Sequence, residues 1–245
     1  MDRQSFIPMG GGGQGQDYIM RMIEEFVTFV GKLMSRIQRG EIKEARKEIE
    51  TFYRDMLSHD AGLLHTFSDR DLIARLSQGG SFDAAKGLNL AKVLMIDAEL
   101  LDRTEAGQAA GMPIARVKYL LAFGLLTEAA AKEGDDFPEW AETDLAALAA
   151  KLADWELPPD LLRKLFRYEE SQGRFGKAED ALFRLQASGF SGIEQEGRLF
   201  YARMDALSDE QLMQGNLPRE ELEEGRARFQ QPPGGRNGAL ASDSA

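Results

Sequence analysis

Two segments of the chain share a pattern that is typical of two antiparallel helices joined by a tight turn. In residues 38–57 (QRGEIKEARKEIETFYRDML) and 171–188 (SQGRFGKAEDALFRLQAS), a glycine is followed two positions later by an apolar residue and five positions later by alanine. Gly40 and Gly173 suit such a turn, because glycine adopts positive φ angles without steric cost. The small alanines let two helices approach closely. This pattern constrains the fold more than any other feature of the chain.

Glycine turns of this kind are typical of tetratricopeptide-type helix pairs, which stack into surfaces that bind other proteins. A regular array repeats about every 34 residues, whereas the two glycines stand at positions 40 and 173. We therefore predict an all-α fold of antiparallel helix pairs, arranged as a degenerate tetratricopeptide-like array (an α/α superhelix). No segment alternates apolar and polar residues between turn signals, so no strand is predicted.

Apolar periodicity divides the chain into a helical body and two flexible ends. Residues 1–16 are a flexible Gly-rich leader, and residues 230–245 (QQPPGGRNGALASDSA) form a disordered tail. Residues 17–229 make one helical repeat-like domain. Its main helices are predicted at residues 18–39, 41–57, 81–101, 114–132, 138–155, 160–172, 174–187 and 193–206, with short ones after Ser68, at 208–213 and at 217–229.

Composition excludes several classes of protein. The chain has 30 basic and 41 acidic residues, and this net charge of −11 repels phosphate backbones, so no nucleic acid is predicted as a partner. Acidic residues gather in residues 128–156, which favours a solvated face over an acidic docking patch. The chain contains no cysteine, which excludes disulfides and thiol catalysis and fits a reducing compartment.

No membrane segment and no signal peptide are predicted. The most apolar run, residues 117–131, is shorter than the ~20 residues that span a bilayer, and it contains Lys118. It is typical of a buried central helix. The first 13 residues lack a long apolar core. The sequence therefore predicts a cytoplasmic protein that does not bind membranes.

No motif predicts a catalytic residue, a cofactor or a metal ion. Residues 10–15 satisfy G-x-G-x-x-G, but a dinucleotide site also needs a preceding strand and a βαβ unit, so a flexible leader is favoured. His59 and His65 fit no metal-binding spacing and are predicted as polar residues of an inter-helix turn. Residues 189–192 (GFSG) are one residue short of a nucleophile elbow. We therefore predict that the chain is not an enzyme.

The candidate partner-binding residues lie on the predicted helix at residues 160–172. Arg163 and Arg167 are neighbours at i, i+4, and Lys164 and Tyr168 form the adjacent row. The first helix of each repeat pair lines the concave face, where these side chains would clamp a carboxylate or an acidic peptide. The alternative is a solvated face with salt bridges to Glu169 and Glu170.

The predicted N-terminal helix has an unusually wide apolar face. Core packing, a dimer interface and a membrane surface are all compatible with such a face. A membrane-surface helix usually carries a basic polar face, whereas Glu24 and Glu25 here dilute the positive charge of Arg21 and Lys32. Core packing is favoured, and a homodimer is the alternative. The face includes Met20, Met22, Phe26, Phe29 and Met34.

Two segments also resemble a known family. Residues 16–26 (QDYIMRMIEEF) and 156–185 (ELPPDLLRKLFRYEESQGRFGKAEDALFRL) are similar to an uncharacterised family of bacterial helical proteins, common in low-GC Gram-positive bacteria, with tetratricopeptide-like organisation. Between the flexible ends the resemblance covers the whole chain, in the middle only as a helix pattern. It implies a bacterial cytoplasmic helical protein with no assigned reaction, cofactor or partner.

Together these observations predict a non-catalytic scaffold that binds an unknown protein or peptide. A second hypothesis is a self-assembling structural protein that dimerises through the N-terminal helix. A third is a small-molecule sensor or an enzyme whose site comes from scattered helical residues. A deep enclosed pocket with several ionisable groups of shifted pKa would distinguish the third hypothesis.

Overall fold

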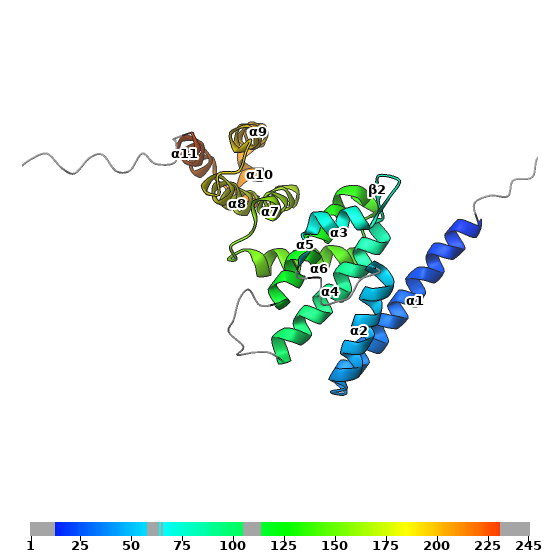
Figure 1. Cartoon of the computed structure of the whole chain (residues 1–245). Coiled ribbons are helices and arrows are strands. Elements are labelled where there is room, and N and C mark those ends of the chain that lie inside the picture. Colours follow the sequence, from blue (N-terminus) through cyan, green and yellow to red (C-terminus); the bar gives the residue numbers. More distant parts are fainter. Residues whose placement is uncertain (1–12, 58–63, 65, 105–113, 231–245) are drawn as a thin grey trace, which may run out of the picture. The chain divides into compact units, whose positions relative to one another are not determined.

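The computed structural model of the chain describes residues 13–57, 64, 66–104 and 114–230 (Figure 1). These residues form eleven α-helices and one short β-ribbon, which confirms the predicted all-α class. The chain divides into two compact bodies, the first ending at Leu125 and the second beginning at Leu126. Most of the predicted leader, the predicted tail from residue 231 and both histidines lie outside the described residues.

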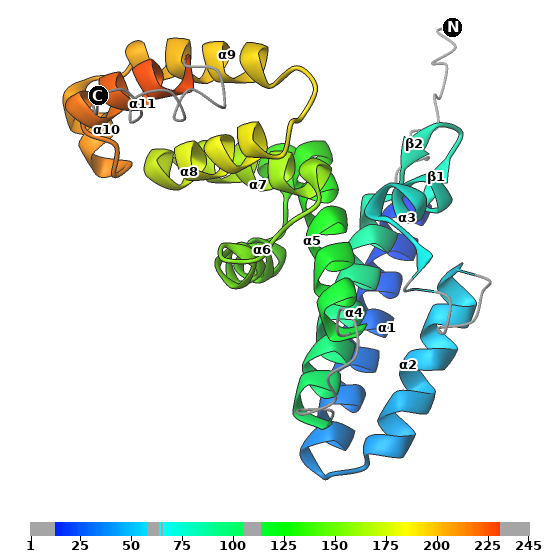
Figure 2. The same ribbon diagram turned by 60° about the vertical axis from the view of Figure 1, so that its left-hand side comes forward.

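The first body begins with an antiparallel helix pair, α1 and α2, that continues into two long helices, α4 and α5 (Figure 2). The helix pair has the predicted turn, although α1 begins at Gly13, five residues before the predicted start at residue 18. The elements are α1 (Gly13–Gln38), α2 (Ile42–Leu57), α3 (Asp69–Arg75), β1 (Ser77–Gln78), β2 (Ser81–Phe82), α4 (Ala84–Thr104) and the first part of α5 (Ile114–Glu133).

The turns of both predicted helix pairs require glycine. Gly40 has a φ of 77° and Gly173 a φ of 67°, in the left-handed region that side chains with a Cβ rarely adopt. A Cβ added at Gly40 would meet nothing within 4 Å. The requirement at this turn is therefore one of backbone conformation and not of space.

Gly40→Ala is expected to lower the free energy of unfolding by about 1–2 kcal/mol, the cost of a left-handed conformation for an L-residue. Gly31→Ala is the matched control, since Gly31 lies inside α1 and a Cβ there also meets nothing within 4 Å. In a helix interior, alanine is favoured over glycine by roughly 1 kcal/mol. Denaturant unfolding should therefore show a lower unfolding free energy for Gly40→Ala and a higher one for Gly31→Ala. Equal losses for both variants would contradict the left-handed conformation of Gly40 in the turn.

The segment between α3 and α4 departs from the prediction of a strand-free chain. Gly79 and Gly80, with φ of 59° and 84°, form the turn of a two-residue antiparallel ribbon in which Ser77 pairs with Phe82. Successive positive φ angles are typical of a tight hairpin turn. Helix α4 consequently begins at Ala84, later than the predicted Ser81. The Asp83 carboxylate precedes the helix and accepts a hydrogen bond from the backbone N–H of Lys86.

Capping and burial in the rest of the first body follow from the sequence. Ser68 and Asp71 form a complete capping box at α3, because an aspartate carboxylate reaches back to the Ser68 backbone N–H at 2.8 Å. Helix α5 is buried along most of its length, as its apolar run predicts. Its core residues in this body and those of α4 include Leu90, Leu94, Phe123 and Leu125.

The second body contains the second predicted helix pair and the helices that follow it. The Phe166 and Phe200 rings pack edge to face across α7 and α9 with centroids 5.5 Å apart, and Tyr201 meets Phe229 of α11 at 5.8 Å. After the end of α5 and the 3₁₀ turn η2 (Gly134–Asp136), the elements are α6 (Glu139–Leu152), α7 (Pro159–Ser171), α8 (Phe175–Ala187), α9 (Ile193–Asp205), α10 (Asp209–Gln214) and α11 (Arg219–Phe229). Across the described ranges, no helix combines the length and apolarity needed to cross a bilayer.

Candidate functional site

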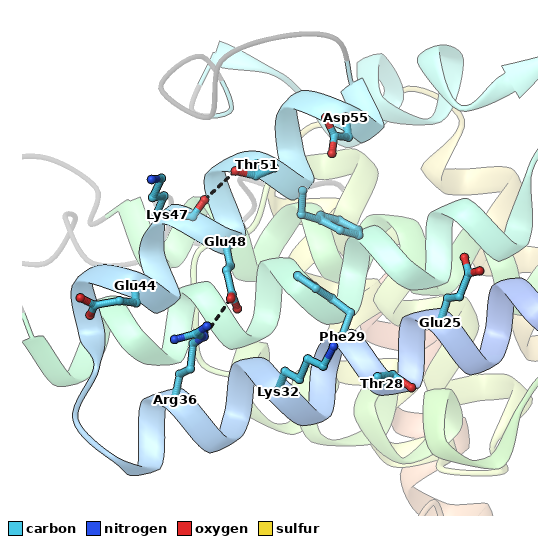
Figure 3. A pocket seen from close by; sticks show the side chains of 11 residues that line it. Glu25, Thr28, Phe29, Lys32, Arg36, Glu44, Lys47, Glu48, Thr51 and Asp55 are labelled. Carbon is cyan, nitrogen blue, oxygen red and sulfur yellow. Dashed lines mark hydrogen bonds and ion pairs between the residues drawn. The ribbon is translucent and has the colours of Figure 1, made fainter.

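An open groove between α1 and α2 is the candidate functional site (Figure 3). Its volume is about 930 Å³. Both apolar and charged side chains line it, and they come from the facing sides of the two helices. The lining residues are Glu25, Thr28, Phe29, Lys32 and Arg36 of α1, and Glu44, Lys47, Glu48, Thr51, Phe52 and Asp55 of α2.

Phenylalanine rings form the apolar part of the groove. Phe29 of α1 and Phe52 of α2 stack with ring centroids 5.3 Å apart and planes inclined by 15°. The Phe26 ring lies 6.2 Å from that of Phe52. All three rings are only half-buried. Apolar side chains that would fill a core in a longer bundle here face solvent.

The two ends of the groove carry different charged residues. Figure 3 shows Glu25 and Asp55 at one end and Arg36 and Lys47 toward the other. Arg36 bridges the helices, since its Nε lies 2.8 Å from Oε1 of Glu48. The other carboxylate oxygen of Glu48 is buried and has no hydrogen-bond partner among the described residues. The groove therefore combines an aromatic centre with polar ends.

A buried polar cluster fixes the α2 wall of the groove from behind. Tyr53, which follows Phe52, donates its hydroxyl to Oδ2 of Asp97 on α4 at 3.0 Å. Lys118 of α5 donates to the same oxygen at 2.6 Å, and its ammonium lies 4.9 Å from the centre of the Tyr53 ring. All three side chains are buried. The cluster thus joins α2, α4 and α5 at one point.

The protonation of this cluster follows from its surroundings. Burial first, and then the negative charge of Asp97, raise the pKa of the Tyr53 hydroxyl well above its usual value, so the hydroxyl remains a hydrogen-bond donor. Two opposite charges in a core are tolerated only with good geometry and complete hydrogen bonding. Sequence reasoning noted Lys118 as the charge in an apolar run, but it did not identify Asp97 and Tyr53 as its partners.

The predicted partner-binding residues of α7 contact two different carboxylates. Arg163 and Arg167 come together on one carboxylate, because their Nε and Nη2 atoms lie 3.6 and 2.6 Å from Oε1 of Glu196 on α9. Lys164 lies elsewhere, with its Nζ 3.7 Å from the Glu128 carboxylate. The arginines therefore already face an acidic side chain of this chain.

The fourth residue of the row and the predicted salt bridges also need correction. Tyr168 is buried, and the guanidinium of Arg174 lies 5.1 Å from its ring centre. Glu169 pairs with Arg174, and Glu170 with Arg203 at 2.6 Å. The alternative prediction, salt bridges from Arg163 and Arg167 to these two glutamates, is wrong about the partners, because residues after α7 compete for them.

Two further ionisable groups of the second body, Glu179 and Tyr201, lie in its packed interior. Tyr201 donates to Glu179 at 2.8 Å, and burial raises the pKa of the Glu179 carboxyl. A Cβ at Gly225 would come within 2.0 Å of that carboxylate, so α11 passes closely over it. Neither Glu179 nor Tyr53 lines the α1–α2 groove. Within the part of the chain that the structure describes, no cluster of three or more His, Cys, Asp or Glu side chains is arranged to hold a metal ion.

The fold and this groove define an all-α protein with an open amphipathic groove between its first two helices. Residues 14–231 match a family described as a family of unknown function (DUF6483). The match covers most of the chain, so the chain belongs to this family, and the predicted membership of an uncharacterised family is confirmed. No curated protein and no solved structure matches the chain.

Proposed function

We propose that the chain is a non-catalytic protein-interaction scaffold, and that its docking surface is the α1–α2 groove. The observation that carries the proposal is the stacked Phe29–Phe52 pair, half-exposed on the surface of the first helix pair. Apolar patches rimmed by polar residues are typical of protein interaction sites. Charged ends with an aromatic centre support the same conclusion.

An amphipathic helix is the occupant that fits this surface. Helix α2 has 16 residues and so extends for about 24 Å, at ~1.5 Å per residue. A groove between two helices of that length accepts the apolar face of a third helix over about four turns. The phenylalanine rings would contact that face, and the charged ends would fix its direction.

The row on α7 is a second docking surface for an acidic segment, as the sequence predicts. The pairing of Arg163 and Arg167 on one carboxylate supports it, since Glu196 occupies the position that a partner carboxylate would take. An incoming acidic segment must displace Glu196, which makes this surface weaker than the groove. Lys164 and Tyr168 lie outside this pair and contribute less.

The proposal keeps the finer predictions made from the sequence. It includes tetratricopeptide-like organisation of the helix pairs, which the positive φ angles at Gly40 and Gly173 support. It also includes a bacterial source, which the family resemblance of the sequence implies, and a cytoplasmic location, which the absence of cysteine supports.

A photo-crosslinking side chain at position 28 tests the groove in cells of the source organism. Thr28 is exposed and lines the groove next to Phe29, whereas Met213, the control position, is 69% exposed on α10, in the second body. We expect light to join position 28 to one defined polypeptide and to leave position 213 without that product. Equal products at both positions, or none at position 28, would contradict a docking surface in the groove.

A further inference from the structure

We infer that the occupant of the groove is a second copy of this chain, so that two α1–α2 pairs pack into a four-helix interface around a two-fold axis. The inference rests on the proposed function of the groove, and it names the partner. Two observations carry it: how little of α1 the first body covers, and how charge is ordered along the groove.

Helix α1 is longer than the helix it pairs with. Its 26 residues extend for about 39 Å, against about 24 Å for α2, at ~1.5 Å per residue. In the described part of the chain, α2 is the helix that packs most closely alongside α1. Among residues 25–38, whose side chains are described, Leu33 alone is fully buried. Because helices in proteins gain most of their stability from packing, a further surface over its exposed side would stabilise α1.

Four of the charges in the groove lie at two levels along it, while Glu48 is held by Arg36 and Glu44 lies beyond the lysine end. On α2, Lys47 and Asp55 are each four residues from Thr51, about 6 Å to either side along the axis. On α1, Lys32 and Glu25 lie on either side of Phe29 in the same way. Because α1 and α2 are antiparallel, the two acids share one level and the two lysines share the other (Figure 3).

A two-fold axis at the level of Phe29 and Thr51 reverses this order in the second copy. The acidic level, Glu25 and Asp55, then faces the lysine level of the other copy, and the lysine level faces the acids. A symmetric dimer uses the same patch on both subunits, so such a patch must be complementary to itself. A parallel arrangement would place like charges together, which is unfavourable. The charge order thus selects the antiparallel dimer.

The apolar residues lie where this dimer needs them. Phe29 and Phe52 stack near the proposed axis, so each ring pair would meet the same pair of the second copy. Arg36 lies beyond the lysine level and is already held by Glu48 of its own chain. The interface therefore has an aromatic centre and a charged rim, as stable interfaces do. Four antiparallel helices around such a centre are a common bundle.

Sedimentation equilibrium of the full chain and of two charge variants tests the inference. We expect the wild-type chain to have twice its monomer mass of 27.2 kDa. Lys32→Glu with Lys47→Glu makes both levels acidic, and Glu25→Lys with Asp55→Lys makes both basic. Each double variant should weaken self-association at least tenfold, about 1.4 kcal/mol, because like charges then face each other. Circular dichroism checks that both remain helical.

Mixing the two variants is the decisive step. An equimolar mixture should recover the doubled mass, because an all-acidic copy faces an all-basic copy. The matched control is Lys151→Glu with Lys177→Glu, which makes the same change in net charge at exposed positions of the second body and should leave the mass doubled. Double variants that still dimerise, or a mixture that stays monomeric, would overturn the proposed arrangement.

The failure of this inference can be separated from failure of the proposed function. A monomeric wild-type chain whose position 28 is joined by light to a different protein overturns the second copy and supports the groove as a docking surface. A monomeric chain with no product at position 28 overturns both. A product of twice the monomer mass, formed at position 28 and lost in each double variant, supports both.

Discussion

Replacing Asp97 by alanine is expected to lower the free energy of unfolding of the first body by about 3–5 kcal/mol, since removing one partner of a buried ion pair leaves the other charge unpaired. In this chain the substitution removes the acceptor of two hydrogen bonds, from Lys118 at 2.6 Å and from Tyr53 at 3.0 Å. Both donors lie in the core and have no access to water there. Urea unfolding followed by circular dichroism measures the loss.

A triple variant separates pairing from packing. Tyr53→Phe, Asp97→Leu and Lys118→Met together replace the cluster by apolar side chains of similar volume, and this should recover most of the loss. A triple variant as unstable as Asp97→Ala would show that the polar contacts are not the cause. The single variant should also loosen the α2 wall of the groove, because Tyr53 anchors the helix turn that carries Phe52.

Phe200→Ala is expected to cost the second body about 3–5 kcal/mol, the usual loss for deleting a fully buried aromatic side chain. Phe200 is inaccessible to solvent, and its ring meets those of Phe166 at 5.5 Å and Tyr201 at 5.2 Å. The cavity would lie where α7 and α9 pack together. Amide hydrogen exchange should show lost protection in these helices.

The adjacent residue provides a matched control for this substitution. Leu199 precedes Phe200 on α9 but is 48% exposed. Leu199→Ala should therefore change the free energy of unfolding by no more than about 0.5 kcal/mol. Equal losses of unfolding free energy at positions 199 and 200 would contradict the finding that Phe200 faces the core and Leu199 faces solvent.

Features that depend on neighbouring residues were predicted well from the sequence. Gly40 and Gly173 indicate turns because a positive φ angle is a property of one residue and its peptide neighbours. The apolar run of α5 indicates burial because few polar residues interrupt it. The ribbon β1–β2 was missed, since two-residue strands are too short to show alternation.

The candidate site was only partly predictable, because its contacts join residues far apart in the sequence. Phe26, Phe29 and Lys32 were noted on the N-terminal helix, but the facing wall depends on the register with α2. Asp97 lies 44 residues from Tyr53 and 21 from Lys118. Its only signal is an acid inside the apolar stretch Val93–Ala98 of α4, and one sequence does not reveal its partners.

The arginines of α7 illustrate the same limit in a predicted site. Their i, i+4 spacing predicts a paired cationic surface, and the structure does bring Arg163 and Arg167 together. The acid between them, Glu196, lies 29 residues beyond Arg167 on another helix. Local spacing thus predicts which side chains are neighbours, while the surrounding charge depends on tertiary packing.

The central claim is that another polypeptide covers the α1–α2 groove, and amide hydrogen exchange measured over a range of protein concentrations tests it most directly. If two copies associate through this groove, protection of residues 25–38 should increase with concentration, while that of α7 and α8 stays constant. Exchange in residues 25–38 that is fast and independent of concentration, in the purified chain and in cell extract alike, would contradict the claim.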